Sequence, residues 1–235
     1  MVTITSIAGG APKPVLDRLG PLYEQRTGNT LNALYDTMSG IQARVAKGDA
    51  LDVLLMPVGM LDDYERAGIV LAAGRAALAN IGLGVGVKTG APIPDISTPE
   101  VLRRALLAAR AVVHAPPSAT PSGAQSDKVL GELGLRDELG SRVQHMAGLA
   151  GGVAAIASGE GVIGIFPKSE IVAFDGMTLA GALPPSLQLN ILYGAGIVAA
   201  SPAAGPAADF IKFLIEPESH KVWAACGFDV PDAMR

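Results

Sequence analysis

Apolar runs of strand length alternate with amphipathic stretches along the first third of the chain. Residues 14–26 repeat apolar side chains at the spacing of one helix face, and Gly28 follows as a helix stop. The uninterrupted apolar run 52–57 is typical of a central parallel strand that is covered on both faces. The pattern predicts strands at 2–7, 31–35 and 52–57 and helices at 14–26, 39–47 and 61–67. This alternation is typical of an α/β fold with a mainly parallel sheet flanked by helices.

A second strand and helix series follows after residue 88. The apolar runs 111–114 and 161–166 predict strands, and two helices are expected to close the chain at 204–214 and 218–225. Further helices are expected at 100–109, 125–133 and 153–158.

Two long apolar stretches that contain glycine flank this second series. Residues 81–87 alternate aliphatic side chains with glycine, and 189–198 form a similar run. Because such strands suit a crossover, we expect two lobes, each a mainly parallel sheet, with a ligand cleft and a hinge. Lobe 1 is expected to comprise 1–80 and 199–235, lobe 2 to comprise 88–188, and 81–87 and 189–198 to be the crossovers.

Glycine turns open three of the expected helices. They contain Gly9-Gly10 after the first strand, Ser39-Gly40 after the second, and Ser122-Gly123-Ala124 after the strand 111–114. We expect Ser122 to be an N-cap. Because helix starts present free N–H groups, and because ligands of parallel sheets bind beyond the carboxyl ends of the strands, these turns predict an anion site.

Composition and charge exclude several classes of protein. The formal net charge is −4 and no basic block is present, so a nucleic-acid partner is not expected. Cys226 is the single cysteine, which excludes an internal disulfide, and we expect it to be buried. The three histidines lie far apart in the sequence, and His220 is expected at the surface. No metal site and no cofactor are therefore expected.

The N-terminal sequence gives an expectation for the cellular compartment of the protein. The chain enters a strand at once, with no basic segment and apolar run before it, so as written it predicts a cytoplasmic protein. If a signal was removed, the protein would be periplasmic.

Several segments together resemble one family across essentially the whole chain. They are Thr5–Gly10, Met38-Ser39-Gly40, Asp52–Pro57, Gly159–Ile165 and the end from Phe210 through Trp223 to Phe228. In order and spacing they resemble the molybdate-binding, type II periplasmic substrate-binding proteins of ABC transporters. The resemblance implies a two-lobed cleft that holds an oxyanion, and a transporter membrane subunit as partner if the protein is exported.

The resemblance also implies which residues contact the ligand. It matches Ser6 and Ser39 to two ligand hydroxyls, Ser122–Ala124 to a helix-start contact, and Gly152-Val153 to another N–H contact. Pro167 stands where the family usually has a tyrosine that contacts the anion, which puts molybdate itself in doubt. Tyr193 is a further candidate for lining the cleft.

The chain is also similar to aconitate isomerase, an enzyme that shares this scaffold and uses no cofactor. Its reaction requires a base, together with donors for the developing negative charge. Candidate bases are Lys13, His145, Lys168 and Glu170, and the cation Arg44 would suit a carboxylate. The sequence leaves binding and isomerisation open as alternatives.

Overall fold

The computed structural model describes residues 1–148 and 151–230, and the chain divides into two compact units. Unit 1 is Met1–Ile81 with Ile191–Arg235, and unit 2 is Gly82–Asn190. The chain passes between the units within the long strand β4 (Val70–Lys88) and again at the start of β9 (Asn190–Val198).

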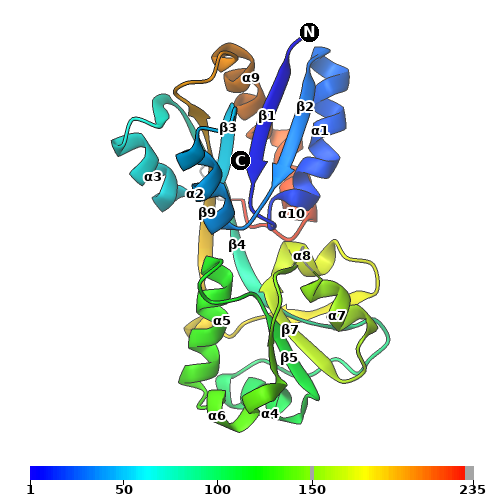
Figure 1. Ribbon diagram of the computed structural model, residues 1–235. Coiled ribbons are helices and arrows are strands. Elements are labelled where there is room, and N and C mark those ends of the chain that lie inside the picture. The colour runs from blue at the N-terminus through cyan, green and yellow to red at the C-terminus, as the bar shows by residue number, and fades with distance from the viewer. Residues whose placement is uncertain (149–150, 231–235) are drawn as a thin grey trace. The chain divides into compact units, whose positions relative to one another are not determined.

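Unit 1 is a mixed sheet with helices on both faces (Figure 1). Strand β1 pairs in parallel with β2 and β3, whereas β9 runs antiparallel to β3. Besides β4 and β9, its elements are β1 (Thr3–Ala8), α1 (Lys13–Thr27), β2 (Thr30–Tyr35), α2 (Met38–Lys47), β3 (Val53–Pro57), α3 (Val58–Arg66), α9 (Ala204–Leu214) and α10 (Pro217–Ala225).

Unit 2 repeats this plan. Strand β5 pairs in parallel with β6 and β7, and β4 runs antiparallel to both β7 and β8. Its elements are α4 (Pro99–Ala108), β5 (Ala111–His114), α5 (Pro121–Glu132), α6 (Arg136–Leu139), η1 (Gly140–Arg142), β6 (Val143–His145), α7 (Gly152–Ser158), β7 (Val162–Pro167), α8 (Lys168–Val172), β8 (Met177–Ala182) and η3 (Pro185–Leu187).

Alternate side chains of a strand pack into the hydrophobic cores on opposite faces of the sheet. In β1, Ile4 and Ala8 face the core formed with α1, α9 and α10, whereas Ile7 faces the core formed with α2 and α3. In β5, Val112 faces α4, α5 and α6, whereas Val113 faces α7 and α8. Both sheets are therefore covered on both faces, which explains why central strands such as β3 and β5 are near-continuous apolar runs.

The α/β class expected from the sequence is confirmed, and three details differ from the expectation. The parallel pairs are joined by antiparallel ones, because β9 runs antiparallel to β3 and β4 runs antiparallel to β7, so the sheets are mixed. Strand β4 begins at Val70, well before residue 81, and the pattern did not predict β8 at all, since its side chains are only half-buried.

Two residues of the terminal helix region test expectations about burial. Cys226 is buried, as expected, and burial raises the pKa of its thiol. The expectation for His220 is wrong: it is 6% exposed, and neither ring nitrogen has a hydrogen-bond partner. Among the helices of the described residues, none has the length and apolar character of a membrane span.

Candidate functional site

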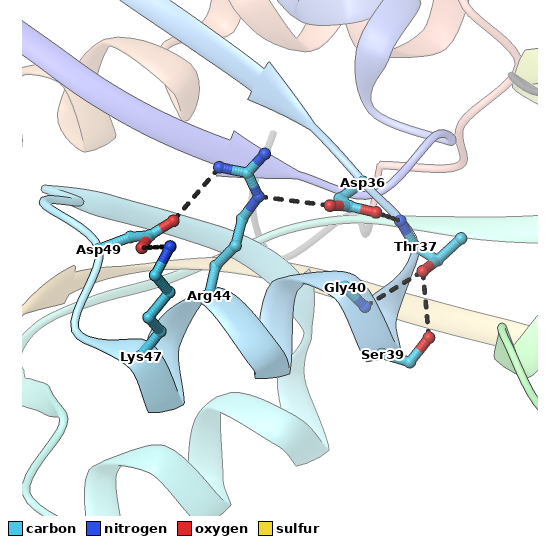
Figure 2. Close-up of polar contacts among 7 residues, drawn as sticks. All are labelled: Asp36, Thr37, Ser39, Gly40, Arg44, Lys47 and Asp49. Carbon is cyan, nitrogen blue, oxygen red and sulfur yellow. Dashed lines mark hydrogen bonds and ion pairs between the residues drawn. The ribbon is translucent and has the colours of Figure 1, made fainter.

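The helix start after β2 is built on a threonine. Thr37 is the N-cap of α2, and its hydroxyl oxygen accepts the Gly40 N–H at 3.1 Å (Figure 2). The Thr37 and Ser39 hydroxyls lie 3.1 Å apart, and Ser39 is exposed. A Cβ at Gly40 would collide with the Asp36 carboxylate, so the glycine lets this side chain lie directly against the first turn.

The helix start after β5 has the same construction. Thr120 is the N-cap of α5, its hydroxyl oxygen accepts the Gly123 N–H at 2.9 Å, and it lies 3.0 Å from the Ser122 hydroxyl. A Cβ at Gly123 would collide with the carbonyl oxygens of Pro116 and Ala115. Each unit thus carries one Thr-x-Ser-Gly helix start.

The threonines correct the expectation that Ser122 is the cap. Because α5 begins at Pro121, Ser122 lies inside the first turn and is buried, 8% exposed. Sequence reasoning missed Thr37 and Thr120 as caps. The signal was present, since a hydroxyl residue three positions before a glycine fits the cap-to-N3 bond.

The threonine caps leave only some of the helix-start N–H groups available to a ligand. Gly40 and Gly123 already donate to their threonines, and Ala124 donates to the Thr120 carbonyl at 3.0 Å within the helix. In α5, Pro121 has no N–H, which leaves the Ser122 amide and hydroxyl. In α2, the first two amides have no acceptor within the helix.

In unit 1, the end of β1 lies beside the start of α2. The Asp36 N–H donates to the Ala8 carbonyl at 3.1 Å. A Cβ at Gly9 would lie 2.6 Å from the Met38 Cε and 3.2 Å from the Tyr193 hydroxyl oxygen. The structure therefore brings Gly9, Tyr193 and the first turn of α2 together, and Gly10 follows in the loop that leads to α1.

Ser6 lies elsewhere. It sits inside β1, on the same face as Ile4 and Ala8, and is fully buried. Its hydroxyl oxygen has no hydrogen-bond partner. In this structure Ser6 is a core residue.

Two candidate cations from the sequence analysis, Lys13 and Arg44, lie in unit 1 and form ion pairs with carboxylates. Lys13 pairs with Asp17 at 2.5 Å, and its ammonium group lies 4.8 Å from the centre of the Tyr35 ring. Burial, and next the Asp17 charge, raise the pKa of Tyr35. Arg44 pairs with Asp36 and with Asp49, each at 3.3 Å (Figure 2).

Two histidines lie together at the carboxyl ends of β5 and β6. His114 is fully buried; its Nδ1 lies 2.8 Å from the Ala115 carbonyl oxygen, and its Nε2 has no partner. His145 is exposed and pairs in register with His114. Burial lowers the pKa of His114, and the neighbouring His145 lowers it further.

The remaining candidate site residues of unit 2 lie at the end of β7, in α8 and at the start of α7. Pro167 is the buried last residue of β7, and Lys168 begins α8. The Gly152 N–H, expected to meet the ligand, donates instead to the Ala147 carbonyl at 2.9 Å, and Val153 is buried against Ile156 and Phe166. Burial raises the pKa of Glu170 to about 7.

No set of three or more metal-ligating side chains gathers within residues 1–148 and 151–230. What the described residues offer instead is hydroxyls and helix-start amides, which are donors to anions.

Comparisons with known proteins show the family and the fold of the chain. A family model described as bacterial extracellular solute-binding protein matches residues 4–229. An aconitate isomerase from a Pseudomonas species is 26% identical over 226 residues, which cover 94% of this chain and 85% of that protein.

Solved structures show the same fold. The periplasmic molybdate-binding protein of Azotobacter vinelandii has a TM-score of 0.82 at 18% identity, covering 97% of this chain and all of that one. The sulfate-binding protein of Mycobacterium tuberculosis H37Rv has a TM-score of 0.78 at 20% identity, covering all of this chain and 89% of that one.

Proposed function

Because the chain belongs to the bacterial extracellular solute-binding protein family, we propose that it binds a small anion, either an oxyanion or an organic carboxylate. The observation that carries the proposal is the pair of Thr-x-Ser-Gly helix starts, one in each unit. Each presents a serine hydroxyl and at least one amide at the positive end of a helix dipole. Similar folds are known as molybdate- and sulfate-binding proteins, which supports the same ligand class.

The family description also bears on location and partner. Solute-binding proteins of this kind are described as extracellular. We therefore propose a periplasmic or outer-face protein that hands its ligand to the membrane subunit of an ABC transporter.

A thermal-shift panel tests the proposal. It compares molybdate, tungstate, sulfate, citrate, cis-aconitate and trans-aconitate, because a ligand that binds only the folded state raises the melting temperature by mass action. At least one of these anions should raise it in a saturable manner. If none does at millimolar concentration, anion binding of these classes is rejected.

Two variants then test the helix starts. Ser39→Ala and Ser122→Ala should each weaken binding of the responding anion by about 5- to 100-fold, because each removes a hydrogen bond to a charged group. Ser158→Ala is the matched control, since Ser158 donates to the Ala154 carbonyl at the far end of α7. Unchanged affinity in both test variants would show that the serines do not contact the ligand.

A second candidate function is isomerisation of an unsaturated polycarboxylate. The similarity to an aconitate isomerase over 94% of the chain favours it. A base would take a proton from carbon, the double bond would shift by one position, and a proton would return to the far carbon. Among Lys13, His145, Lys168 and Glu170, we favour Glu170, because a general base works best when its pKa lies near the working pH.

Proton NMR of trans-aconitate in heavy water separates the two functions. An isomerase should produce the cis isomer or incorporate deuterium, and Glu170→Gln should reduce that rate by at least 100-fold. Saturable binding with neither conversion nor deuterium uptake would leave the binding protein and reject the enzyme for this substrate.

A further inference from the structure

The starts of α2 and α5 are each capped by a threonine, but they differ in the group that lies against the first-turn glycine. Against Gly123 lie two neutral backbone carbonyls, of Pro116 and Ala115. Against Gly40 lies the carboxylate of Asp36. A full negative charge therefore sits at the first turn of α2, the turn proposed to receive an anion.

Two hydrogen bonds orient that carboxylate. One oxygen of Asp36 accepts the Thr37 N–H at 2.8 Å, and the other accepts the Arg44 Nε–H at 3.3 Å (Figure 2). Polar contacts thus run without a break from the Ser39 hydroxyl through Thr37 and Asp36 to Arg44.

Arg44 also reaches a second carboxylate, and the group as a whole is neutral. Its Nη1 lies 3.3 Å from Asp49, which Lys47 approaches to 4.0 Å on the other side. Two cations, Arg44 and Lys47, face two anions, Asp36 and Asp49. Of the two cations, only Arg44 contacts Asp36.

An unbalanced carboxylate at this place would oppose the proposed function. It would satisfy the positive end of the helix dipole itself and repel an incoming anion across a few ångströms. A cation paired with it restores the attraction.

We propose that Arg44 is a charge-balancing residue, which offsets the Asp36 carboxylate so that the first turn of α2 accepts an anion. This rests on the proposed function but assigns Arg44 no contact with the ligand. It predicts that anion binding at the start of α2 requires Arg44. The start of α5 needs no such cation, because neutral carbonyls lie against Gly123.

A thiolate placed at Ser39 serves as the probe anion, so the test needs no identified ligand. Ser39→Cys is made together with Cys226→Ala, and the pKa of the new thiol is measured from the pH dependence of its alkylation by iodoacetamide. Adding Arg44→Gln should raise this pKa by about one unit, since the thiolate is then left near an unbalanced carboxylate. Adding Asp36→Asn should lower it, and the double change Arg44→Gln with Asp36→Asn should return it close to its starting value.

Lys47→Gln is the matched control. It removes one positive charge from the same helix without touching a contact of Asp36, so it should shift the thiol pKa much less. An unchanged thiol pKa in Arg44→Gln, or equal shifts in Arg44→Gln and Lys47→Gln, overturns the inference. Failure of the ligand panel with the unmodified protein would instead reject the proposed function.

Discussion

The ring of His114 lies edge-on to the ring of His145, with the ring centres 4.7 Å apart and the planes at 60°. Residues 114 and 145 meet because β5 and β6 pair in register at their carboxyl ends. His114 has no solvent exposure, and Asp127 of α5 raises its pKa only as the smallest of four effects. The pair is thus buried on one side and open to solvent on the other.

The buried His114 makes the free energy of unfolding depend on pH. Because the folded pKa of His114 lies below its ordinary value of 6.5, the unfolded chain binds the proton more readily. The contribution of His114 to the free energy of unfolding should therefore fall as pH drops below about 6.5. In urea melts between pH 8 and pH 5, the stability of His114→Gln relative to the parent should therefore increase as the pH falls. His220, whose pKa burial also lowers, keeps part of the slope.

Glu170 should give the opposite dependence. Its carboxylate lies against Gly148, and burial raises its pKa from 4.5 to about 7. Between these values the folded chain keeps a proton that the unfolded chain has lost, so the contribution of Glu170 to stability should fall as pH rises, by about 3 kcal/mol in all. Glu170→Gln should be more stable than the parent at pH 8, measured by urea melts. Identical pH profiles for the two proteins would contradict this.

Ser6 offers a direct test of its place in the core. Ser6→Ala removes a buried hydroxyl that has no partner, so stability should stay the same or rise by about 1 kcal/mol. Affinity for the anion found by the panel should not change. Loss of affinity in Ser6→Ala, with a melting temperature at or above that of the parent, would show that the hydroxyl meets the ligand after all.

The threonine caps should contribute to stability. Thr37→Ala and Thr120→Ala each remove the acceptor of a helix-start amide and should cost about 1 kcal/mol. Thr37→Ser and Thr120→Ser keep the hydroxyl and serve as controls. Chemical denaturation measures each difference, and a loss in the serine variants equal to that in the alanine variants would argue against capping.

The two first-turn glycines should differ in their tolerance of a methyl group. Gly123→Ala meets backbone carbonyls, which cannot turn aside, and should cost about 1 to 3 kcal/mol. Gly40→Ala meets the side chain of Asp36, which can rotate away, and should cost less. Gly59→Ala, in α3 with open space around it, should instead stabilise by up to about 1 kcal/mol. Denaturation of the three variants ranks them.

The sequence alone determined the class of the fold and the existence of the helix starts. Apolar runs such as 52–57 and amphipathic helices such as 14–26 are local patterns, and burial on both faces of a sheet enforces them. The first-turn glycines Gly40 and Gly123 are also a local feature, because each packs against residues that shortly precede it in the sequence. These features needed no knowledge of which segments pair.

Only the tertiary structure decided which polar groups are free and which are engaged. Ser6 lies in the core because the face of β1 that carries Ile4, Ser6 and Ala8 is covered by α1, α9 and α10. His114 gains its neighbour because β6 pairs with β5, although residues 114 and 145 lie far apart in the chain. A polar side chain acquires its role from the groups packed against it, and long-range strand pairing sets those groups.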